Sequence, residues 1–297
     1  MNGSSASRSE VHLGTVVSIS IEDLPGASSA VDRAFLWFRD VEVVCSRFDP
    51  HSELMRLIQQ VGSAVPVSQL LFEAVRFACE MAARTDGAFD PTVGRVMETR
   101  GFNREHRSGA EVRTDISPTA DVSYRDVVCD ADAITITLRR PVVLDLGAVA
   151  KGLALDMAAM ELRPFRNFAI DAGGDLYLGG HNPNGERWSV GIRHPRRDGE
   201  LIDAVLASDR AVCTSGDYER RTNAGHHILD PRTGRPAEGV ASVTVLAPSA
   251  MLADATATAA FVLGPVKGLQ LCAAIGLEAL LITTDLERRE TPGLRDQ

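Results

Sequence analysis

Residues 145–152 of this 297-residue chain read Asp-Leu-Gly-Ala-Val-Ala-Lys-Gly, and they join a strand-like run, residues 141–146, to a helix-like run, residues 150–162. A strand that leads through glycine and small residues into a helix lets a ligand approach the backbone closely. The helix N-terminus also offers unpaired amides and a partial positive charge. Lys151 would add a full charge suited to a phosphate, and Asp145 could bind a ribose or a polar ring group. A tight turn with a solvated lysine accounts for the stretch about equally well.

Outward from this stretch, strand-like and helix-like segments mix without strict βαβ alternation, so we predict the α+β class rather than a doubly wound sheet. The predicted strands are residues 13–21, 133–138, 168–171, 175–178, 188–193, 204–207, 241–247 and 279–283, and the other predicted helices are residues 31–45, 68–84, 253–263 and 266–275. Residues 1–10 are predicted to be a flexible start, residues 11–284 one folded domain, and residues 285–297 a charged tail. Residues 100–126 are predicted to be a charged surface excursion.

Composition and charge narrow the classes of partner. The hydrophobic fraction is 44% and the net charge is −9, so the surface repels nucleic acid and anionic membranes, and we expect neither as a partner. The five cysteines show no zinc or disulfide spacing. Because no signal peptide or transmembrane segment is visible, we expect a cytoplasmic location.

A possible cation site lies in the predicted helix near the C-terminus. Asp254 and Thr258 are four residues apart and would share one helix face. A carboxylate beside a hydroxyl is a partial site for Mg²⁺, which takes oxygen ligands and keeps waters or substrate phosphates. Taken alone, a helix-capping role for Asp254 explains this pair better.

A second polar cluster contains a histidine among turn residues. It comprises residues 214–218 (Thr-Ser-Gly-Asp-Tyr) and 226–234 (His-His-Ile-Leu-Asp-Pro-Arg-Thr-Gly). His227 could position a substrate or act as a base, since histidine titrates near neutral pH. Alternatively, Asp230 begins an ordinary turn and the histidines are structural. Residues 87–94 form a further glycine-bounded loop, Gly-Ala-Phe-Asp-Pro-Thr-Val-Gly.

Taken together, these segments indicate a class of protein more specifically than any one of them does alone. The common dinucleotide, P-loop, zinc-protease, hydrolase and kinase motifs are absent from the sequence. Residues 46–54, 87–94, 145–152, 214–218, 227–234 and 254–258 instead resemble, in order, the motifs of the FAD:protein FMN transferases of the ApbE family. The resemblance extends over roughly residues 12–284. It departs from the family pattern at Leu13, where methionine is usual, and at Ala257, where an acidic residue is often found.

The resemblance implies a fold and a set of site residues. The fold would be two duplicated T-fold-like halves with mixed, mostly antiparallel sheets flanked by helices, and FAD would bind between them. Mg²⁺ would be held by the side chains of Asp254 and Thr258 and the backbone carbonyl of Ala148. The residues expected to contact FAD are Phe48, Ala88, Phe89, Asp90, Asp145, Lys151 and Ile228.

The resemblance also implies a reaction. The FMN half of FAD would be transferred to a threonine hydroxyl of a target flavoprotein, with AMP as leaving group and Mg²⁺ on the pyrophosphate. Lys151 would stabilise charge, and His227 or Asp230 would take the proton. Two alternatives share these residues: a Mg²⁺-dependent FAD pyrophosphatase, in which water replaces threonine, and a non-catalytic FAD-binding protein.

Overall fold

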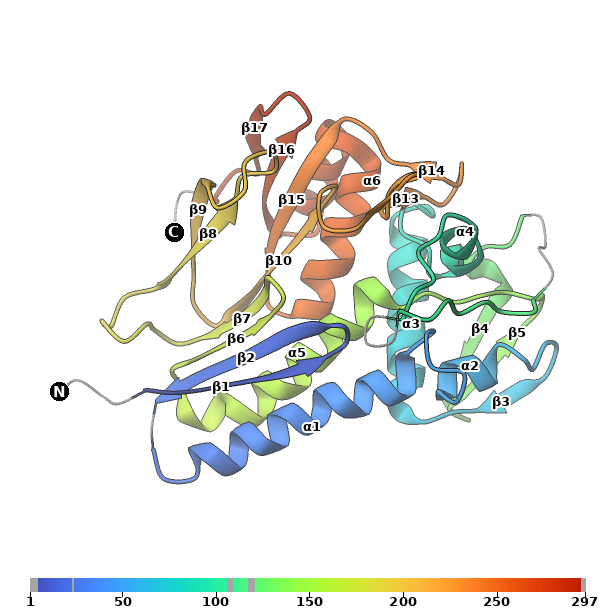
Figure 1. The fold of residues 1–297 in the computed structure, drawn as a ribbon, viewed down its shortest axis with the longest axis horizontal. Coiled ribbons are helices and arrows are strands. Elements are labelled where there is room, and N and C mark those ends of the chain that lie inside the picture. The colour runs from blue at the N-terminus through green and yellow to red at the C-terminus, as the bar shows by residue number, and fades with distance from the viewer. Residues whose placement is uncertain (1–4, 23, 106–108, 117–120, 295–297) are drawn as a thin grey trace.

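The computed structural model describes residues 5–22, 24–105, 109–116 and 121–294. Its largest element is an eight-stranded antiparallel sheet, with the strand order β1-β2-β6-β7-β10-β15-β16-β17 (Figure 1). These strands are β1 (Ser5–His12), β2 (Thr15–Glu22), β6 (Phe168–Ala172), β7 (Asp175–Gly179), β10 (Arg210–Gly216), β15 (Val240–Ala247), β16 (Glu278–Thr283) and β17 (Arg288–Glu290). β2 shows why the sheet forms, since Val17, Ile19 and Ile21 alternate with less buried residues and point into the core.

Three long helices cover one face of this sheet (Figure 1). They are α1 (Ala27–Cys45), α5 (Gly147–Leu162) and α6 (Ala250–Ala274). α5 packs against α1 and α6, and α6 also packs against β10 and β15. The main hydrophobic core lies between these helices and the sheet, and it includes Phe38, Phe168 and Phe261.

Two contacts fix how α5 crosses α6. Gly152 lies directly against the start of α6, and a methyl group at this position would be 2.5 Å from the Cα of Met251. One turn further along α5, the carboxylate of Asp156 accepts hydrogen bonds from the backbone N–H groups of Ala250 (2.6 Å) and Met251 (3.0 Å). These are N–H groups of the first turn of α6, which have no partner within the helix. The crossing therefore places Lys151 of α5 near the second turn of α6.

The opposite face of the sheet and the remaining segments carry smaller units. A hairpin of β8 (Trp188–Arg193) and β9 (Leu201–Ala207) forms a second core with residues of the large sheet, including Val212 and Leu246. A three-stranded sheet of β3 (Ala64–Pro66), β5 (Thr135–Leu138) and β4 (Val127–Asp130) lies to the right in Figure 1. The helices α2 (Glu53–Leu57), α3 (Gln69–Arg84) and α4 (Gly94–Thr99) belong to that side. The short elements are η1 (Pro91–Val93), η2 (Tyr124–Asp126), η3 (Arg163–Phe165), β11 (Arg221–Thr222), β12 (Gly225–His226), β13 (Leu229–Asp230) and β14 (Arg235–Pro236).

The α+β class with antiparallel sheets is confirmed, and the duplicated T-fold-like arrangement stays a prediction. The predicted helices at residues 253–263 and 266–275 belong to one helix, α6, which is interrupted where Gly264 adopts φ of 80° before Pro265. Among the described residues α6 alone has the length and composition to cross a membrane. It lies in the core against α5, β10 and β15, which accounts for its apolar composition.

The structure has a strand near each end of the chain that the sequence did not predict. The polar start is a strand from Ser5 onward, and β1 pairs with β2 along its whole length, so backbone hydrogen bonds order it without an apolar pattern. In the charged tail, β17 pairs with β16, and the hydroxyl of Thr291 accepts a hydrogen bond from the N–H of Ala279 (2.9 Å). Residues 1–4 and 295–297 lie outside the described residues.

The predicted strand at residues 141–146 is also wrong. This segment has no regular structure, although Val142, Val143 and Leu144 are buried and explain its strand-like composition. Its backbone makes single hydrogen bonds to the loop around η1, from the N–H of Asp145 to the carbonyl of Pro91 (2.7 Å) and from the N–H of Gly94 to the carbonyl of Val143 (3.1 Å). An apolar run can thus be buried without joining a ladder. The predicted surface excursion at residues 100–126 includes the buried residues Phe102 and Asn103.

Candidate active site

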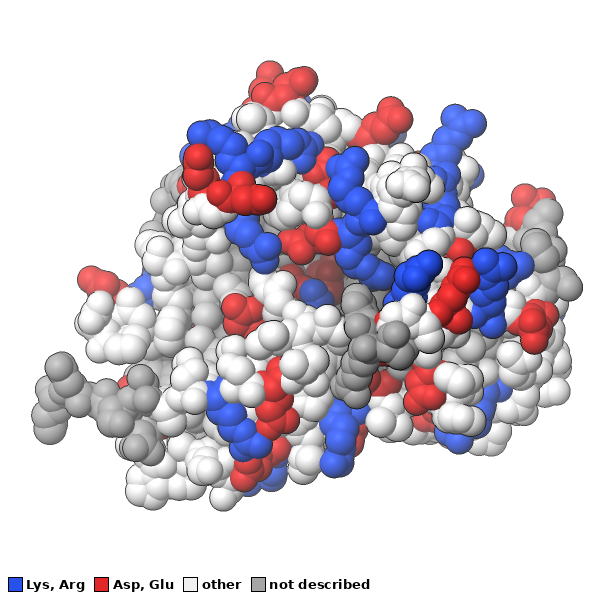
Figure 2. All heavy atoms as spheres, in the orientation of Figure 1, with Lys and Arg blue, Asp and Glu red and all other residues white. Residues whose placement is uncertain are grey.

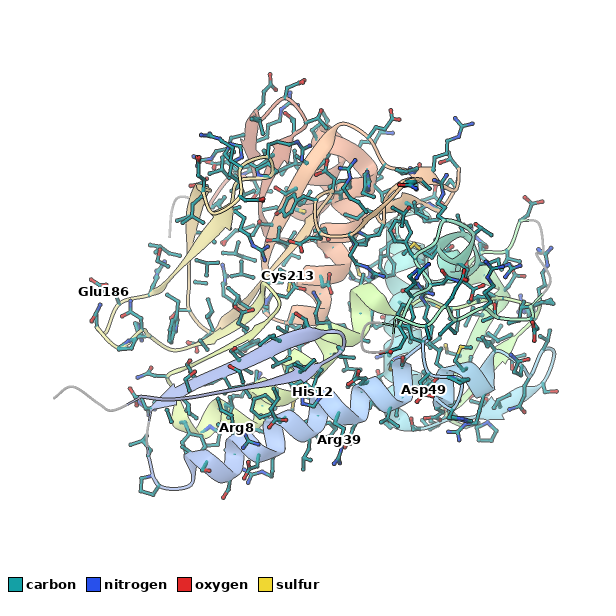
Figure 3. All side chains as sticks on the ribbon, in the orientation of Figure 1. Arg8, His12, Arg39, Asp49, Glu186 and Cys213 are labelled. Atoms are coloured by element: carbon teal, nitrogen blue, oxygen red, sulfur yellow. The ribbon has the colours of Figure 1, made fainter. Side chains whose placement is uncertain are left out.

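One large cavity, about 1590 Å³ in volume, collects residues from distant parts of the chain. Figure 2 shows a hollow near the centre of this face, with acidic and basic side chains in its depth. Three residues of its lining are labelled in Figure 3: His12 at the end of β1, Arg39 in α1, and Asp49 in the loop after α1. The cavity exceeds the roughly 300–1,000 Å³ of common small-molecule sites, so it has room for a large ligand.

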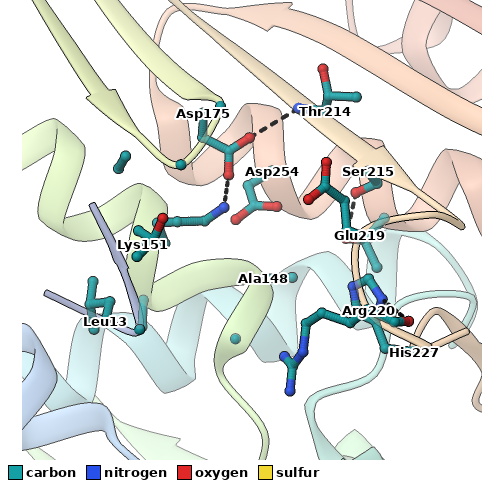
Figure 4. A pocket seen from close by; sticks show the side chains of 18 of the residues that line it. Leu13, Ala148, Lys151, Asp175, Thr214, Ser215, Glu219, Arg220, His227 and Asp254 are labelled. Carbon is teal, nitrogen blue, oxygen red and sulfur yellow. Dashed lines mark hydrogen bonds and ion pairs between the residues drawn. The ribbon is translucent and has the colours of Figure 1, made fainter. Parts of the chain in front are cut away.

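One wall of the cavity carries two aspartates and a lysine, and we call it the acidic wall: Lys151, Asp175 and Asp254 (Figure 4). The ammonium group of Lys151 forms an ion pair with Oδ2 of Asp175, whose Oδ1 accepts a hydrogen bond from the N–H of Thr214 (3.0 Å). Burial alone would lower the pKa of Lys151, but Asp175 and Asp254 raise it, so the lysine stays charged.

Asp254 is the least satisfied member of the acidic wall. It is only 6% exposed, and its Oδ2 atom has no hydrogen-bond partner among the described residues. Burial, and then the charge of Asp175, raise its pKa to about 7, although Lys151 acts in the opposite direction. A buried carboxylate oxygen without a donor is costly, and a bound cation would remove that cost.

The other predicted metal ligands lie on the same wall. Thr258 lies one turn after Asp254 on α6, and its hydroxyl is 3.2 Å from the hydroxyl of Ser215. Ala148 lines the cavity where α5 departs from helical torsions, with φ of −93° and ψ of 16°. Among the described residues no three His, Cys, Asp or Glu side chains cluster as a metal site. The donors present are carboxylate, hydroxyl and carbonyl oxygens, which fit Mg²⁺ rather than a transition metal.

Another part of the lining carries two arginines and one aspartate, and we call it the arginine wall: Arg47, Arg220 and Asp145. Nε of Arg47 lies 2.6 Å from Oδ2 of Asp145, and Oδ1 of Asp145 accepts a hydrogen bond from the N–H of Gly147 (2.8 Å). Burial would raise the pKa of Asp145, but the arginines and the Gly147 N–H lower it. Asp145 therefore orients Arg47 in the structure as well as lining the cavity.

His227 lies beside the arginine wall and is neutral at physiological pH. Burial, and then the charge of Arg220, lower its pKa to about 4. Its Nδ1 atom is 3.4 Å from the backbone carbonyl of Arg220 (Figure 4), and because a carbonyl only accepts, Nδ1 carries the proton. The other ring nitrogen, Nε2, is then the proton-accepting atom.

The structure does not bring Asp230 to the cavity. Its carboxylate accepts hydrogen bonds from Nε (2.8 Å) and Nη2 (2.9 Å) of Arg232, on the β13–β14 hairpin, and it does not belong to the lining. The turn interpretation of this residue fits the structure, and its predicted part in proton removal has no support from the geometry.

The remaining sequence-predicted residues do line the cavity. They are Phe48, Ala88, Phe89, Asp90 and Ile228. The guanidinium of Arg47 lies over the ring of Phe48, 4.3 Å from its centre. The carboxylate of Asp90 accepts three hydrogen bonds: from the N–H (2.9 Å) and hydroxyl (2.7 Å) of Thr92 in its own loop, and from the N–H of Tyr124 in η2 (3.0 Å). We therefore read Asp90 as shaping the cavity rather than offering a free carboxylate.

Sequence reasoning missed Asp175, Arg47 and Arg220. Asp175 follows the Gly173-Gly174 pair, and the sequence there is equally compatible with a hairpin turn and with ligand contact, while Arg47 lies without an assigned role in residues 46–54. Only the fold shows that Asp175 reaches Lys151 and that Arg47 reaches Asp145.

The α+β fold thus holds a large cavity with two charged groups of residues: the acidic wall, where one carboxylate oxygen has no partner among the described residues, and the arginine wall. The particular family is shown by comparison. The model of the ApbE family matches residues 13–281, and the chain belongs to that family.

Two similar proteins carry the same name. An FAD:protein FMN transferase of Vibrio cholerae serotype O1 is 31% identical over 300 residues, which cover 92% of this chain and 87% of the relative. A protein of the same name from Rhodobacter capsulatus is 34% identical over 297 residues, or 95% of this chain, but the chain spans only 56% of that relative. The chain is thus an enzyme of the transferase class.

A solved structure supports the same assignment. The crystal structure of the ApbE protein from Thermotoga maritima MSB8 matches this fold with a TM-score of 0.85 at 31% sequence identity, and the match covers 97% of both chains. The topology described above is therefore that of a known ApbE protein.

Proposed function

We propose that this protein transfers the FMN half of FAD to a threonine hydroxyl of a target flavoprotein and releases AMP, with Mg²⁺ bound at the acidic wall. The observation that carries the proposal is Oδ2 of Asp254, which is buried beside the Lys151–Asp175 pair and has no hydrogen-bond partner in the part of the chain that the structure describes. The names of the relatives support the choice of FAD and FMN. The predicted cytoplasmic location stays a prediction.

The reaction needs positioning and charge stabilisation more than covalent chemistry. The threonine oxygen forms a new bond to the FMN-side phosphorus, the bond from that phosphorus to the bridging oxygen breaks, and AMP leaves with the bridging oxygen. When bound, Mg²⁺ would supply neutralisation of pyrophosphate charge. Asp254, Thr258 and the carbonyl of Ala148 would hold it.

The chain's own residues would do the remaining work. Lys151 is held charged by Asp175 and stabilises negative charge on the phosphates. Arg47 and Arg220 add positive charge on the arginine wall. Nε2 of neutral His227 is the group we propose to accept the threonine proton.

The test uses the intact protein with FAD, MgCl₂ and candidate acceptor flavoproteins. Covalent flavin fluorescence is scored on a denaturing gel, and AMP is measured by chromatography. We expect fluorescence on the acceptor and one AMP per FMN transferred. Both signals should disappear with EDTA or with an acceptor in which the threonine is changed to valine.

Two other outcomes would replace the proposal. AMP release from FAD at the same rate with and without acceptor would identify an FAD pyrophosphatase. Tight FAD binding with no AMP under any condition, unchanged in Asp254→Ala, would identify a non-catalytic FAD-binding protein.

A further inference from the structure

We propose that the acceptor segment of the target protein binds as an extended strand along the free edge of β8, next to the cavity. This inference rests on the proposed function, because it concerns how the second reactant reaches the site. It assigns a binding mode to a surface outside the groups that would hold FAD and the metal.

β8 is an edge strand that faces the cavity. Within the described residues its one strand partner is β9, with which it forms a two-stranded antiparallel hairpin. All six residues of β8 line the cavity, whereas no residue of β9 does. The unpaired edge of β8 is therefore the edge turned toward the cavity. Such an edge is a template for adding another strand.

The backbone groups available on this edge follow from the strand geometry. The N–H of His194, directly after β8, donates to the carbonyl of Glu200 (2.8 Å) and so points toward the β9 side. Because these groups alternate along an antiparallel strand, the N–H and C=O groups of Ser189, Gly191 and Arg193 point away from β9. These three residues are also exposed. Trp188, Val190 and Ile192 instead pack in the second core, which anchors the strand.

The edge of β8 leads to the proposed reacting groups. A methyl group at Gly174 would be 3.0 Å from Nη2 of Arg193, so the end of β8 lies against the turn between β6 and β7. The next residue after that glycine is Asp175, which pairs with Lys151. A strand added to β8 would thus run toward the acidic wall. Figure 3 labels Glu186 at the outer end of the loop that enters β8, far from this turn.

The occupant is a polypeptide rather than a second small ligand for two reasons. The outward N–H and C=O groups of β8 repeat at the spacing of a neighbouring strand, which only another backbone matches along several residues. In addition, a cavity of about 1590 Å³ is larger than common small-molecule sites, which leaves room for a second reactant beside the dinucleotide.

The experiment first selects a probe and then tests the edge. A library of ten-residue peptides with a fixed central threonine is incubated with the intact enzyme, FAD and Mg²⁺, and the peptide that gains covalent flavin fastest is synthesised. Ser189→Pro removes an outward N–H of β8 without breaking the pairing with β9. Leu206 lies directly opposite Ser189 and is 45% exposed, so Leu206→Pro removes an N–H on the far edge of the hairpin as the matched control.

We expect Ser189→Pro to raise the peptide KM about tenfold through lost backbone hydrogen bonding. The peptide KM of Leu206→Pro should stay within about twofold of wild type. The two proline variants should have the same FAD dissociation constant and the same thermal midpoint. N-methylation of the peptide at alternate positions should also raise its KM.

Equal effects of the two prolines, or no effect of either, would overturn the strand-addition mode. So would a wild-type enzyme that modifies folded acceptor proteins but no peptide of the library. A wild-type enzyme that transfers FMN to neither, and releases no AMP, would instead sink the proposed function itself, so the two failures are distinguishable.

Discussion

The two walls of the cavity differ in charge and in the kind of structure that carries them. The acidic wall, with Lys151, Asp175 and Asp254, has one positive and two negative side chains. The arginine wall, with Arg47, Arg220 and Asp145, has two positive and one negative. One wall thus favours a cation and the other an anion, although the whole chain carries −9.

The walls also stand on different elements of the fold. The acidic wall stands on α5, α6 and the first residue of β7, where the crossing at Gly152 and the Asp156 cap fix the backbone. Arg47 and Asp145 lie in connecting segments just after α1 and just before α5. Binding residues are often held on loops by a rigid scaffold. We therefore expect changes in the acidic wall to affect chemistry most, and changes in the arginine wall to affect stability and ligand binding.

The largest effect is expected from Asp254→Ala. Without this carboxylate the acidic wall loses its unpartnered oxygen, so FMN transfer in Mg²⁺ should fall by about 10³-fold, while the FAD dissociation constant changes little. Initial rates of AMP release and flavin titrations measure the two quantities.

Thr256 provides the matched control. It lies two residues from Asp254 in α6, it is fully buried, and its hydroxyl has no partner among the described residues. Thr256→Val should leave transfer unchanged and alter the free energy of unfolding by less than about 1 kcal/mol. If Asp254→Ala kept wild-type dependence on Mg²⁺, the contrast between the walls would be wrong.

A smaller but clear effect is expected from Arg47→Ala on the other wall. Asp145 would lose its ion-pair partner in a mostly buried position, so the free energy of unfolding should fall by about 3 kcal/mol, as measured by chemical denaturation. Adding Asp145→Asn should restore part of this loss, because the unpaired charge is removed. If the double variant were less stable than Arg47→Ala, the loss would come from packing of Arg47 rather than from its charge.

The two walls also differ in how much of each the sequence predicted. The motifs around Lys151 and Asp254 marked two members of the acidic wall, because helical spacing and short segments carry local information. Asp175 was missed, since its distance of 24 residues from Lys151 in sequence is closed only by the pairing of β6, β7 and β10. Arg47 and Asp145 are 98 residues apart, and no local pattern could pair them.

The incorrect predictions have a common physical origin. Residues 141–146 looked like a strand because burial selects apolar residues whether or not a ladder forms. β1 was missed because backbone pairing can order a polar segment at the edge of a sheet. In both cases a tertiary contact, absent from the local sequence, decided the outcome. Asp230 differs from these two, because a local partner, Arg232, holds its carboxylate, and its proposed part in proton removal stays a prediction.

The smallest expected effect is on the pH dependence of stability, and it concerns His227 beside the arginine wall. Its folded pKa of about 4 lies below its ordinary value of 6.5, so between these pH values the unfolded chain binds more protons than the folded chain. Stability contributed by neutral His227 is therefore complete above pH 6.5, and on the order of 2 kcal/mol of it is lost as the pH falls toward 4.

His227→Gln should lack this part of the pH dependence, as measured by urea unfolding between pH 6.5 and 4. His51→Gln, at an exposed position outside the cavity, should retain it. Because the positive charge of Arg220 helps to lower this pKa, Arg220→Gln should raise the folded pKa of His227, so the loss should be smaller and should end at a higher pH. If the loss were unchanged, the arginine wall would not be what keeps His227 neutral and able to accept a proton.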